Sequence, residues 1–289
     1  MKFSTLFLII TMTAFSMHSL GQSFFDVGNL SYENVNYRPG SEQNYNVVKF
    51  SARLNYGHQI KNEDYLLVFY SGEIFKFQDI SIAGDDLDLY ANFIGAGYLH
   101  FWKNKKWSLL TQVRFKFNSD EFNPLIKYAQ TGGWFLLTNK RSEKLNFFAG
   151  MYFNQEVEKT LIFPIGGLHW IPNNKWNLYV LIPSNIRFEY ILKKECWYTG
   201  IESDWTLNSY RVHKNPGIYY FRKETLNTSV FIEKQFSKSI VIFGKIGNYQ
   251  LNDFEAYDLQ NNLIPNSSLD SNLIDNLSLQ VGMAFRLRD

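Results

Sequence analysis

Apolar side chains occupy every second position near the end of the chain. From Leu277 to Leu287 the alternating apolar residues are Leu277, Leu279, Val281, Met283, Phe285 and Leu287, separated by smaller or polar residues. Because successive side chains leave a strand on opposite faces, this period of two predicts a strand with one apolar face. Soluble strands usually have about five or six residues, whereas a tilted strand needs about 9–11 to cross a bilayer. The pattern therefore predicts a membrane-spanning strand.

The same alternation recurs along the chain and predicts about fourteen strands, or twelve if two short ones are misread. The predicted strands lie near 24–36, 45–57, 65–76, 88–102, 107–118, 125–138, 145–154, 160–170, 175–182, 186–192, 196–206, 224–236, 239–249 and 275–287. A soluble sandwich can alternate in the same way, but the number and length of the strands favour a barrel. We predict an all-β fold, a transmembrane antiparallel up-and-down β-barrel.

Within 45–57 the alternation assigns a direction to each side chain. Phe50 and Leu54 fall on the apolar face and are expected to contact lipid, while Arg53 falls on the other face and is expected in the lumen. A shift of one residue would reverse both assignments.

The first 21 residues have the layout of a secretory leader. Lys2 is followed by an apolar run, and Ser19 and Gly21 are small residues suited to a cut before Gln22. The alternative is a single-pass anchor, but the apolar run here is interrupted by Ser and Thr and is too short to span a membrane. We therefore predict a signal peptide over 1–21, a barrel domain over 22–289, and export to the outer membrane of a bacterium with two membranes.

The predicted connections alternate between short and long, as in outer-membrane barrels, whose periplasmic turns are short. The short ones are rich in Lys, and most long ones are acidic. Ordinary solvated turns would explain that charge asymmetry equally well. Two connections depart from the series: 183–185, which begins with Pro183, is short where a long one is due, and the predicted loop 207–223 is basic and aromatic.

Charged residues within the predicted strands fall between the apolar positions. A charge facing lipid near the midplane costs about 2–4 kcal/mol, so these residues are expected in the lumen. Their mixed signs suggest internal ion pairs, with a role in selectivity or solute contact as the alternative. The candidates are Lys49, Arg53, Glu73, Arg114, Lys116, Arg187, Glu189, Glu202, Asp204, Glu233, Lys245 and Arg286.

The sequence gives no sign of a catalytic or metal-binding motif. The sequence contains no G-x-S-x-G and no H-E-x-x-H. Its one cysteine, Cys196, excludes an intramolecular disulfide, and its net charge of +2 gives no nucleic-acid footprint. We predict no enzyme, no cofactor and no metal, with outer-membrane lipid and the barrel-assembly machinery as partners. Outside the predicted signal peptide the histidines are His58, His100, His169 and His213.

The segment 161–190 is the most distinctive part of the chain. It contains Pro164-Ile165-Gly166-Gly167, then Lys175-Trp176 at a strand start, then Pro183 and a strand ending at Tyr190. Proline in a sheet lies at strand ends or bulges, so the segment either punctuates strands or forms a bulge that narrows the lumen.

These motifs resemble an outer-membrane β-barrel family of unknown function, domain of unknown function 6268. The earlier segment Leu54-Asn55-Tyr56-Gly57-His58-Gln59-Ile60-Lys61, with Tyr65-Leu66, is similar to that family too, except that members commonly have Pro where this chain has Gly57. The resemblance covers nearly the whole mature chain. It implies a membrane location and a barrel fold, and it brings no catalytic residues.

The sequence leaves several functions open. The leading one is passive or gated passage of a small solute, or a structural barrel without transport. The alternatives are an outer-membrane enzyme that modifies lipid and a secreted soluble protein that binds lipid. At the C-terminus we expect Phe285 to serve as the terminal aromatic assembly signal, and Arg288 and Asp289 to extend dispensably into the periplasm.

Overall fold

The structure is a computed structural model that describes residues 24–37, 45–60, 64–82, 85–122, 129–157, 159–214, 217–258, 262 and 276–288. These residues form fourteen strands. The strands are β1 (Phe24–Tyr37), β2 (Tyr45–Gln59), β3 (Tyr65–Ile82), β4 (Asp85–Phe101), β5 (Trp107–Ser119), β6 (Gln130–Ser142), β7 (Leu145–Gln155), β8 (Thr160–Asn173), β9 (Trp176–Ile182), β10 (Asn185–Lys193), β11 (Trp197–Lys214), β12 (Gly217–Gln235), β13 (Ile240–Tyr257) and β14 (Leu277–Arg288). The predicted leader lies outside the described residues.

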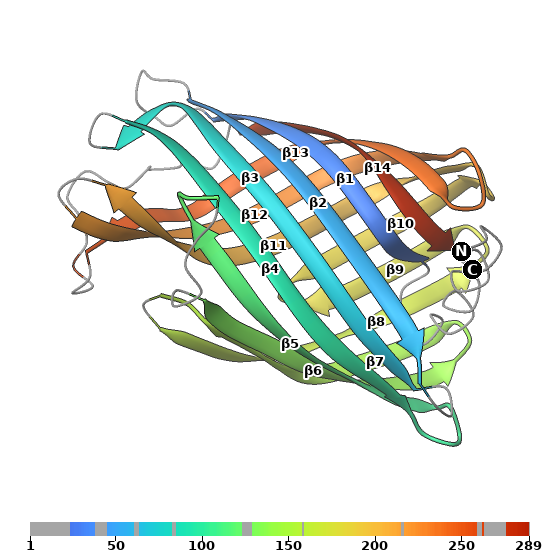
Figure 1. Ribbon diagram of the computed structural model, residues 1–289. Coiled ribbons are helices and arrows are strands. Elements are labelled where there is room, and N and C mark those ends of the chain that lie inside the picture. The colour runs from blue at the N-terminus through green and yellow to red at the C-terminus, as the bar shows by residue number, and fades with distance from the viewer. Residues whose placement is uncertain are drawn as a thin grey trace, which may run out of the picture.

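The strands form one closed up-and-down barrel (Figure 1). Each strand pairs antiparallel with the next along the chain, and β14 pairs with β1 from Phe24↔Arg288 to Asn36↔Leu277. Closure gives every strand a neighbour on both sides, whereas an open sheet would leave a whole strand edge unpaired in the bilayer. The predicted fold class and the count of fourteen strands are confirmed.

Apolar side chains cover the outside of this barrel. Phe50 is 46% exposed and Leu54 is 61% exposed, whereas Arg53 points inward and lies 3.6 Å from Glu73. An apolar exterior around a charged interior, with an even number of strands, is the architecture of an outer-membrane barrel. The soluble alternative, whose apolar faces would point inward, is contradicted. None of the described residues forms a helix long and apolar enough to span a membrane.

The predicted loop 207–223 is wrong. Strand β11 runs to Lys214 and β12 resumes at Gly217, so this stretch is a continuous hairpin. The stretch forms strands because it contains aromatic and β-branched residues, which the barrel interior buries. Tyr210, Val212 and Phe221 are completely buried.

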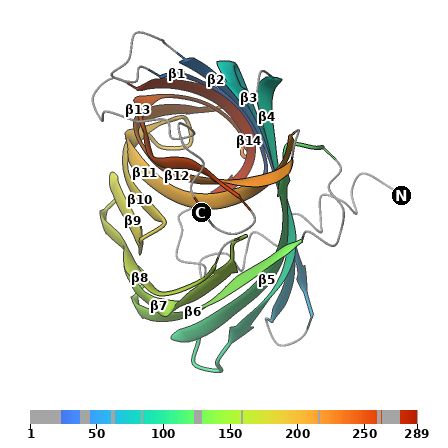
Figure 2. The same cartoon turned by 90° about the vertical axis from the view of Figure 1, so that its left-hand side faces the viewer.

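The outer half of this hairpin leans into the barrel. Arg211 of β11 pairs with Ser119 of β5, six strands away along the barrel wall. Figure 2 shows β11 and β12 crossing the interior between the β1–β4 side and the β5–β10 side. The crossing separates two lobes. On the β1–β4 side the space is filled by an apolar cluster of Val35, Val47, Phe75, Phe77, Leu87, Leu89, Ala91, Tyr210, Val212, Phe221, Tyr249 and Ala256.

The short connection at Pro183 is real. Strands β9 and β10 have 7 and 9 residues, while their neighbours β8 and β11 have 14 and 18. The β9–β10 hairpin therefore ends well short of the outer ends of the strands beside it (Figure 1).

Candidate functional site

All twelve charged residues proposed for the lumen lie on the inner face of the barrel. Some form ion pairs across the interior, and the others line the cavities described below. Their positions alternate with outward apolar residues along each strand, which is why the sequence could locate them. The structure collects them in two groups. One lies on β2, β3 and β5, and the other on β10 to β14.

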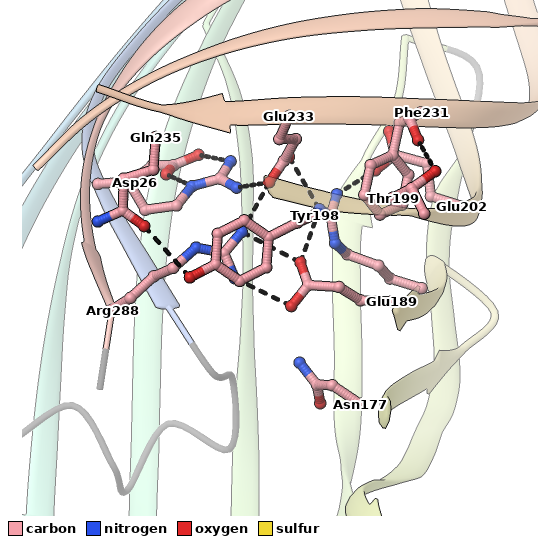
Figure 3. A network of polar contacts seen from close by, with 12 residues as sticks. Asp26, Asn177, Glu189, Tyr198, Thr199, Glu202, Phe231, Glu233, Gln235 and Arg288 are labelled. Atoms are coloured by element: carbon pink, nitrogen blue, oxygen red, sulfur yellow. Dashed lines mark hydrogen bonds and ion pairs between the residues drawn. The ribbon is translucent and has the colours of Figure 1, made fainter. Parts of the chain in front are cut away.

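The second group forms a charged cluster, which we define as Asp26, Arg187, Glu189, Glu202, Glu233, Lys245, Arg286 and Arg288. Figure 3 shows Asp26, Glu189, Glu202, Glu233 and Arg288 of this cluster converging from strands that are far apart in the sequence. Glu233 is its centre: its carboxylate accepts hydrogen bonds from Arg187 at 2.8 Å, Arg286 at 2.7 Å and Arg288 at 2.6 Å. Glu233 is 1% exposed, and a charge buried to this extent is tolerated only when it is paired and hydrogen-bonded.

The other members of the charged cluster extend these bonds around the wall. Arg187 also donates to Glu202 at 2.5 Å and to Glu189 at 3.1 Å, and Arg286 reaches Asp26 of β1 at 2.5 Å. Lys245 pairs with Glu202. The charged cluster therefore fastens β14 to β1 at the closing seam and ties both to β10, β11 and β12.

Arg288 belongs to this cluster, so the expectation that it extends into the periplasm is wrong. Its guanidinium contacts both oxygens of Glu189, at 2.9 and 3.1 Å, and lies over the ring of Tyr198. The physical reason is the register of the seam: Arg288 lies opposite Phe24 and, like Arg286, points inward. Asp289 lies outside the described residues.

Within the first group, Arg53 and Glu73 lie in a more open part of the interior. Glu73 lies 3.5 Å from Lys49 and 3.6 Å from Arg53. The Arg53 side chain is 58% exposed, although it faces the interior. Arg53 and Glu73 therefore border open space within the barrel rather than a packed core.

A buried polar contact holds the inward hairpin against the opposite wall. Lys116 of β5 donates to Glu156 at 2.7 Å, and the other Glu156 oxygen accepts from the Ser209 backbone N–H at 2.8 Å and from its hydroxyl at 2.5 Å. We call Lys116, Glu156 and Ser209 the outer lock. All three residues are at most 3% exposed. A second contact lies beside it, where Asp120 accepts from the His213 backbone N–H at 2.9 Å.

Sequence reasoning placed Lys116 but missed the outer lock. Glu156 reads as one more acidic residue of an outer connection, and Ser209 as part of a loop. The Lys116–Glu156 contact joins residues 40 positions apart, and the Glu156–Ser209 contact joins residues 53 apart. The run of aromatic and β-branched residues around Ser209 was the one available signal that this stretch is buried.

Two adjoining cavities lie inside the barrel, and residues from β1–β4 as well as from β5–β14 line them. The cavity beside Phe24 and Arg286 measures about 500 Å³ and the other about 350 Å³. They meet, because both are lined by Arg53, Trp134, Leu181, Ser184, Asn185 and Asp204. The lining combines charged groups with aromatic rings; for example, the rings of Tyr152 and Phe163 stack at 4.7 Å.

The histidines form other contacts than those of a hydrolase. His100 bonds Asp64 at 3.0 Å, and His169 bonds Asn177 at 2.7 Å. His213 bonds Asp120 at 3.3 Å, so each of these three histidines has a carboxylate or an amide as a partner. Within the described part of the chain, no group of three or more His, Cys, Asp or Glu residues could hold a metal ion.

The chain is similar to several solved channel structures. The chain is similar to an outer-membrane channel from Pseudomonas putida F1, at a TM-score of 0.44 and 12% identity over 89% of this chain and 94% of that one. It is similar to the NanC porin, at a TM-score of 0.38 and 11% identity over 89% and 98% of the two chains. It is also similar to a mutant of the TodX monoaromatic hydrocarbon channel, at 0.37 and 9% over 94% and 92%. At these identities the role of the present chain stays unassigned.

No curated protein matches this sequence. A family described as a domain of unknown function, DUF6268, matches residues 88–286, which is more than half of the chain and includes the distinctive segment 161–190. The resemblance inferred from the motifs is thereby confirmed, and the chain belongs to the DUF6268 family of β-barrels, whose function is unknown.

Proposed function

We propose that this barrel provides a gated path for small solutes through its interior, along the two adjoining cavities. The observation that carries the proposal is the pair of adjoining cavities of about 500 and 350 Å³ inside the barrel, whose lining includes charged and polar side chains. A barrel of purely structural function has no need for unfilled polar space, and the β1–β4 lobe shows that this chain can fill its interior with apolar side chains.

The charges indicate how selective and how open such a path would be. Arg53, Glu73 and Asp204 line it with both signs, which argues against strong preference for anions or cations. The outer lock holds the β11–β12 hairpin across the outer half of the barrel. Release of that hairpin is the motion that would widen the path.

Planar-bilayer recording tests the proposal. The refolded mature chain is expected to give discrete conductance steps, and replacement of Arg53 by Glu is expected to shift the reversal potential in a salt gradient toward cation preference. Arg141→Glu is the matched control, because Arg141 is exposed at the end of β6, in a turn that we place on the periplasmic side. Absence of conductance from a barrel that migrates as folded on an unheated denaturing gel would favour a structural role.

The proposal includes an export route. We propose that residues 1–21 are removed before Gln22, that the barrel-assembly machinery inserts the mature chain, and that outer-membrane lipid surrounds it. The apolar exterior supports a lipid environment. N-terminal sequencing of the protein recovered from outer membranes should start at Gln22, and recovery as a soluble periplasmic protein would contradict the route.

The proposal assigns the chain no catalytic step. The competing function, a lipid-modifying enzyme, needs a nucleophile beside a base, and the histidine contacts to Asp64, Asn177 and Asp120 do not favour it. Incubation of the folded barrel with mixed phospholipid–detergent micelles should release no fatty acid above the rate of a buffer control.

A further inference from the structure

The barrel wall is interrupted above the β9–β10 turn. The β8–β9 ladder begins only at Gly166↔Ile182, and the β10–β11 ladder ends at Asn185↔Asp204, followed by one bond from Trp205 N–H to the Ser184 carbonyl at 2.9 Å. Among the described residues, 160–165 of β8 have ladder partners only in β7, and 206–210 of β11 only in β12. Two strand edges thus face each other without a strand between them.

This interruption lies at the depth of the membrane. The seven residues of β9, tilted by about 40°, rise only about 18 Å, whereas the apolar band of such barrels is about 25 Å tall. Outward residues beside it are apolar and exposed: Ile182 at 58% and Ile162 at 67%. Unpaired backbone at this depth is tolerated where it lines a water-filled cavity or is buried in protein.

Side chains frame the interruption on every side. Above it, Ser209 is held by Glu156, and the Val157 N–H donates to the Ser209 hydroxyl at 2.9 Å. Across it, the ring of Phe163 from β8 meets the ring of Trp205 from β11 edge to face, at 6.0 Å between centroids. We call this frame the side window, bounded by residues 156–157, 161–165, 182–185 and 205–209.

The cavity of about 350 Å³ lies behind the side window. Its lining includes Leu161 and Phe163 from one edge, Trp205 and Leu207 from the other, and Ser184 from the turn below. The same cavity extends to Arg114 on the β5 wall. Its volume falls within the range of about 300–1,000 Å³ that suits small organic ligands. An apolar molecule in the outer leaflet would meet rings at the window and a cation inside.

That cation, Arg114, is short of partners. Its Nη2 donates to the Tyr152 hydroxyl, and its guanidinium lies 5.1 Å from the centre of the Tyr152 ring and 5.7 Å from that of Phe93. Within the described part of the chain it forms no ion pair with a carboxylate, and its buried Nε donates to no acceptor. Lys116, two residues later, is by contrast fully paired with Glu156.

The strand beside Arg114 has a glycine, which leaves space for the guanidinium. Gly132 lies opposite Arg114 on β6, and a Cβ at Gly132 would lie 3.2 Å from the Arg114 Nε and 2.5 Å from the Asn154 Oδ1. The buried Nε faces Gly132, so the edge of the guanidinium left for a ligand is that of Nη1 and the second N–H of Nη2. Such an edge binds a carboxylate through two parallel N–H bonds. The geometry points to an anionic ligand of that shape.

We propose that the side window admits amphipathic carboxylates from the outer leaflet, with the carboxylate on Arg114 and the apolar body against Tyr152, Phe163 and Trp205. This rests on the proposed path, since it names the substrate class and the side of entry. The exposed side chains of Ile162 and Ile182 at the outside of the side window suit the apolar body of a molecule that arrives from lipid. Arg114 inside suits its carboxylate.

Calorimetry on the full chain in nanodiscs tests the site, with octanoate as the probe and empty nanodiscs subtracted. Saturable binding of octanoate is expected, with at least tenfold weaker binding of octanol and of acetate. Arg114→Gln should reduce octanoate affinity at least tenfold and leave octanol unchanged, while Arg114→Lys should be intermediate. Equal octanoate affinity in Arg114→Gln, or no saturable binding to the parent, would overturn the proposal. Migration of each variant on an unheated gel reports whether it folds.

A cross-link tests the route. In a Cys196→Ser background, joining Phe163→Cys/Trp205→Cys with a short bis-maleimide should slow octanoate entry from vesicles by at least tenfold relative to the same variant before cross-linking. The matched control is Ser203→Cys/Thr228→Cys, a pair on the outer face of two strands that are already hydrogen-bonded. Octanoate should enter this cross-linked control at the parental rate. Equal entry in both would refute the side window.

The two proposals fail separately. If ions pass through the barrel but octanoate does not bind, the side window falls while the path stands. If octanoate binds through Arg114 but no ions pass, the site stands and the conducting path falls.

Discussion

Arg288 at the end of β14 forms a two-pronged ion pair with Glu189 of β10, at 2.9 and 3.1 Å, although these strands are not neighbours in the barrel. The pair spans the interior and fixes the last strand after it has closed on β1. Closure of the barrel is therefore stabilised by side chains in the lumen as well as by the seam's backbone ladder.

Removing Arg288 should weaken the barrel. Arg288→Ala leaves Glu189 with one guanidinium fewer in a buried site, and breaking such a pair costs about 3–5 kcal/mol. Urea unfolding of the refolded protein, followed by tryptophan fluorescence, measures the loss. Arg141→Ala, at an exposed position of β6, should change stability by less than about 0.5 kcal/mol; an equal effect of both variants would show that Arg288 is not anchored.

The facing of β2 can be tested by charge placement. Leu54→Arg puts a cation on the lipid side and should destabilise the inserted barrel by about 2–4 kcal/mol, while Arg53→Ala, on the inner face beside Glu73, should be milder. Folding into vesicles, scored by heat-dependent migration on a gel, gives the comparison. Efficient folding of Leu54→Arg would place the register one residue away.

The outer lock should control conductance. Glu156→Gln leaves Lys116 buried without its anion, and a loss of about 3 kcal/mol would shift the balance between the docked and released hairpin by about 100-fold. Single-channel recording should then show a larger or more frequent open state. Lys116→Gln/Glu156→Gln serves as a second variant without a stranded charge, and Glu121→Gln, an exposed acid on the same side, should behave like the parent.

Acid should weaken one contact at the end that we place on the periplasmic side. Asp64, in the turn between β2 and β3, accepts from the Tyr98 hydroxyl at 2.5 Å and from the Phe101 N–H at 3.3 Å. The Tyr98 hydrogen bond, followed by those of His100 and Phe101, holds the pKa of the Asp64 carboxyl below its usual 3.8. A lowered pKa contributes stability that is complete above the unfolded value and is lost as the pH falls through the folded one.

The measurement compares the parent with Asp64→Asn in urea at several pH values. The parent should be the more stable at pH 7, and the difference should shrink as the pH falls below about 4. A difference that stays constant with pH would mean that the charge of Asp64 has no part in the contact.

Much of the barrel follows from alternation alone. The period of two from Leu277 to Leu287 and in 45–57 locates strands and their facing, because lipid and lumen demand opposite chemistry on successive residues. That demand is local, so Leu54, Arg53 and the inward charges could be read from the printed chain. Even the exceptional short turn at Pro183 was visible, and it marks the lower edge of the side window.

The tertiary structure decided where the inward residues meet. Lys116, Glu156 and Ser209 become neighbours only when β11 leaves the wall, and Arg288 reaches Glu189 only when the register of the seam is set. Phe163 and Trp205 face each other only because β9 and β10 stop short between them. Alternation specifies a face for each residue but not its partner across the lumen, since that depends on strand register, tilt and closure of the whole barrel.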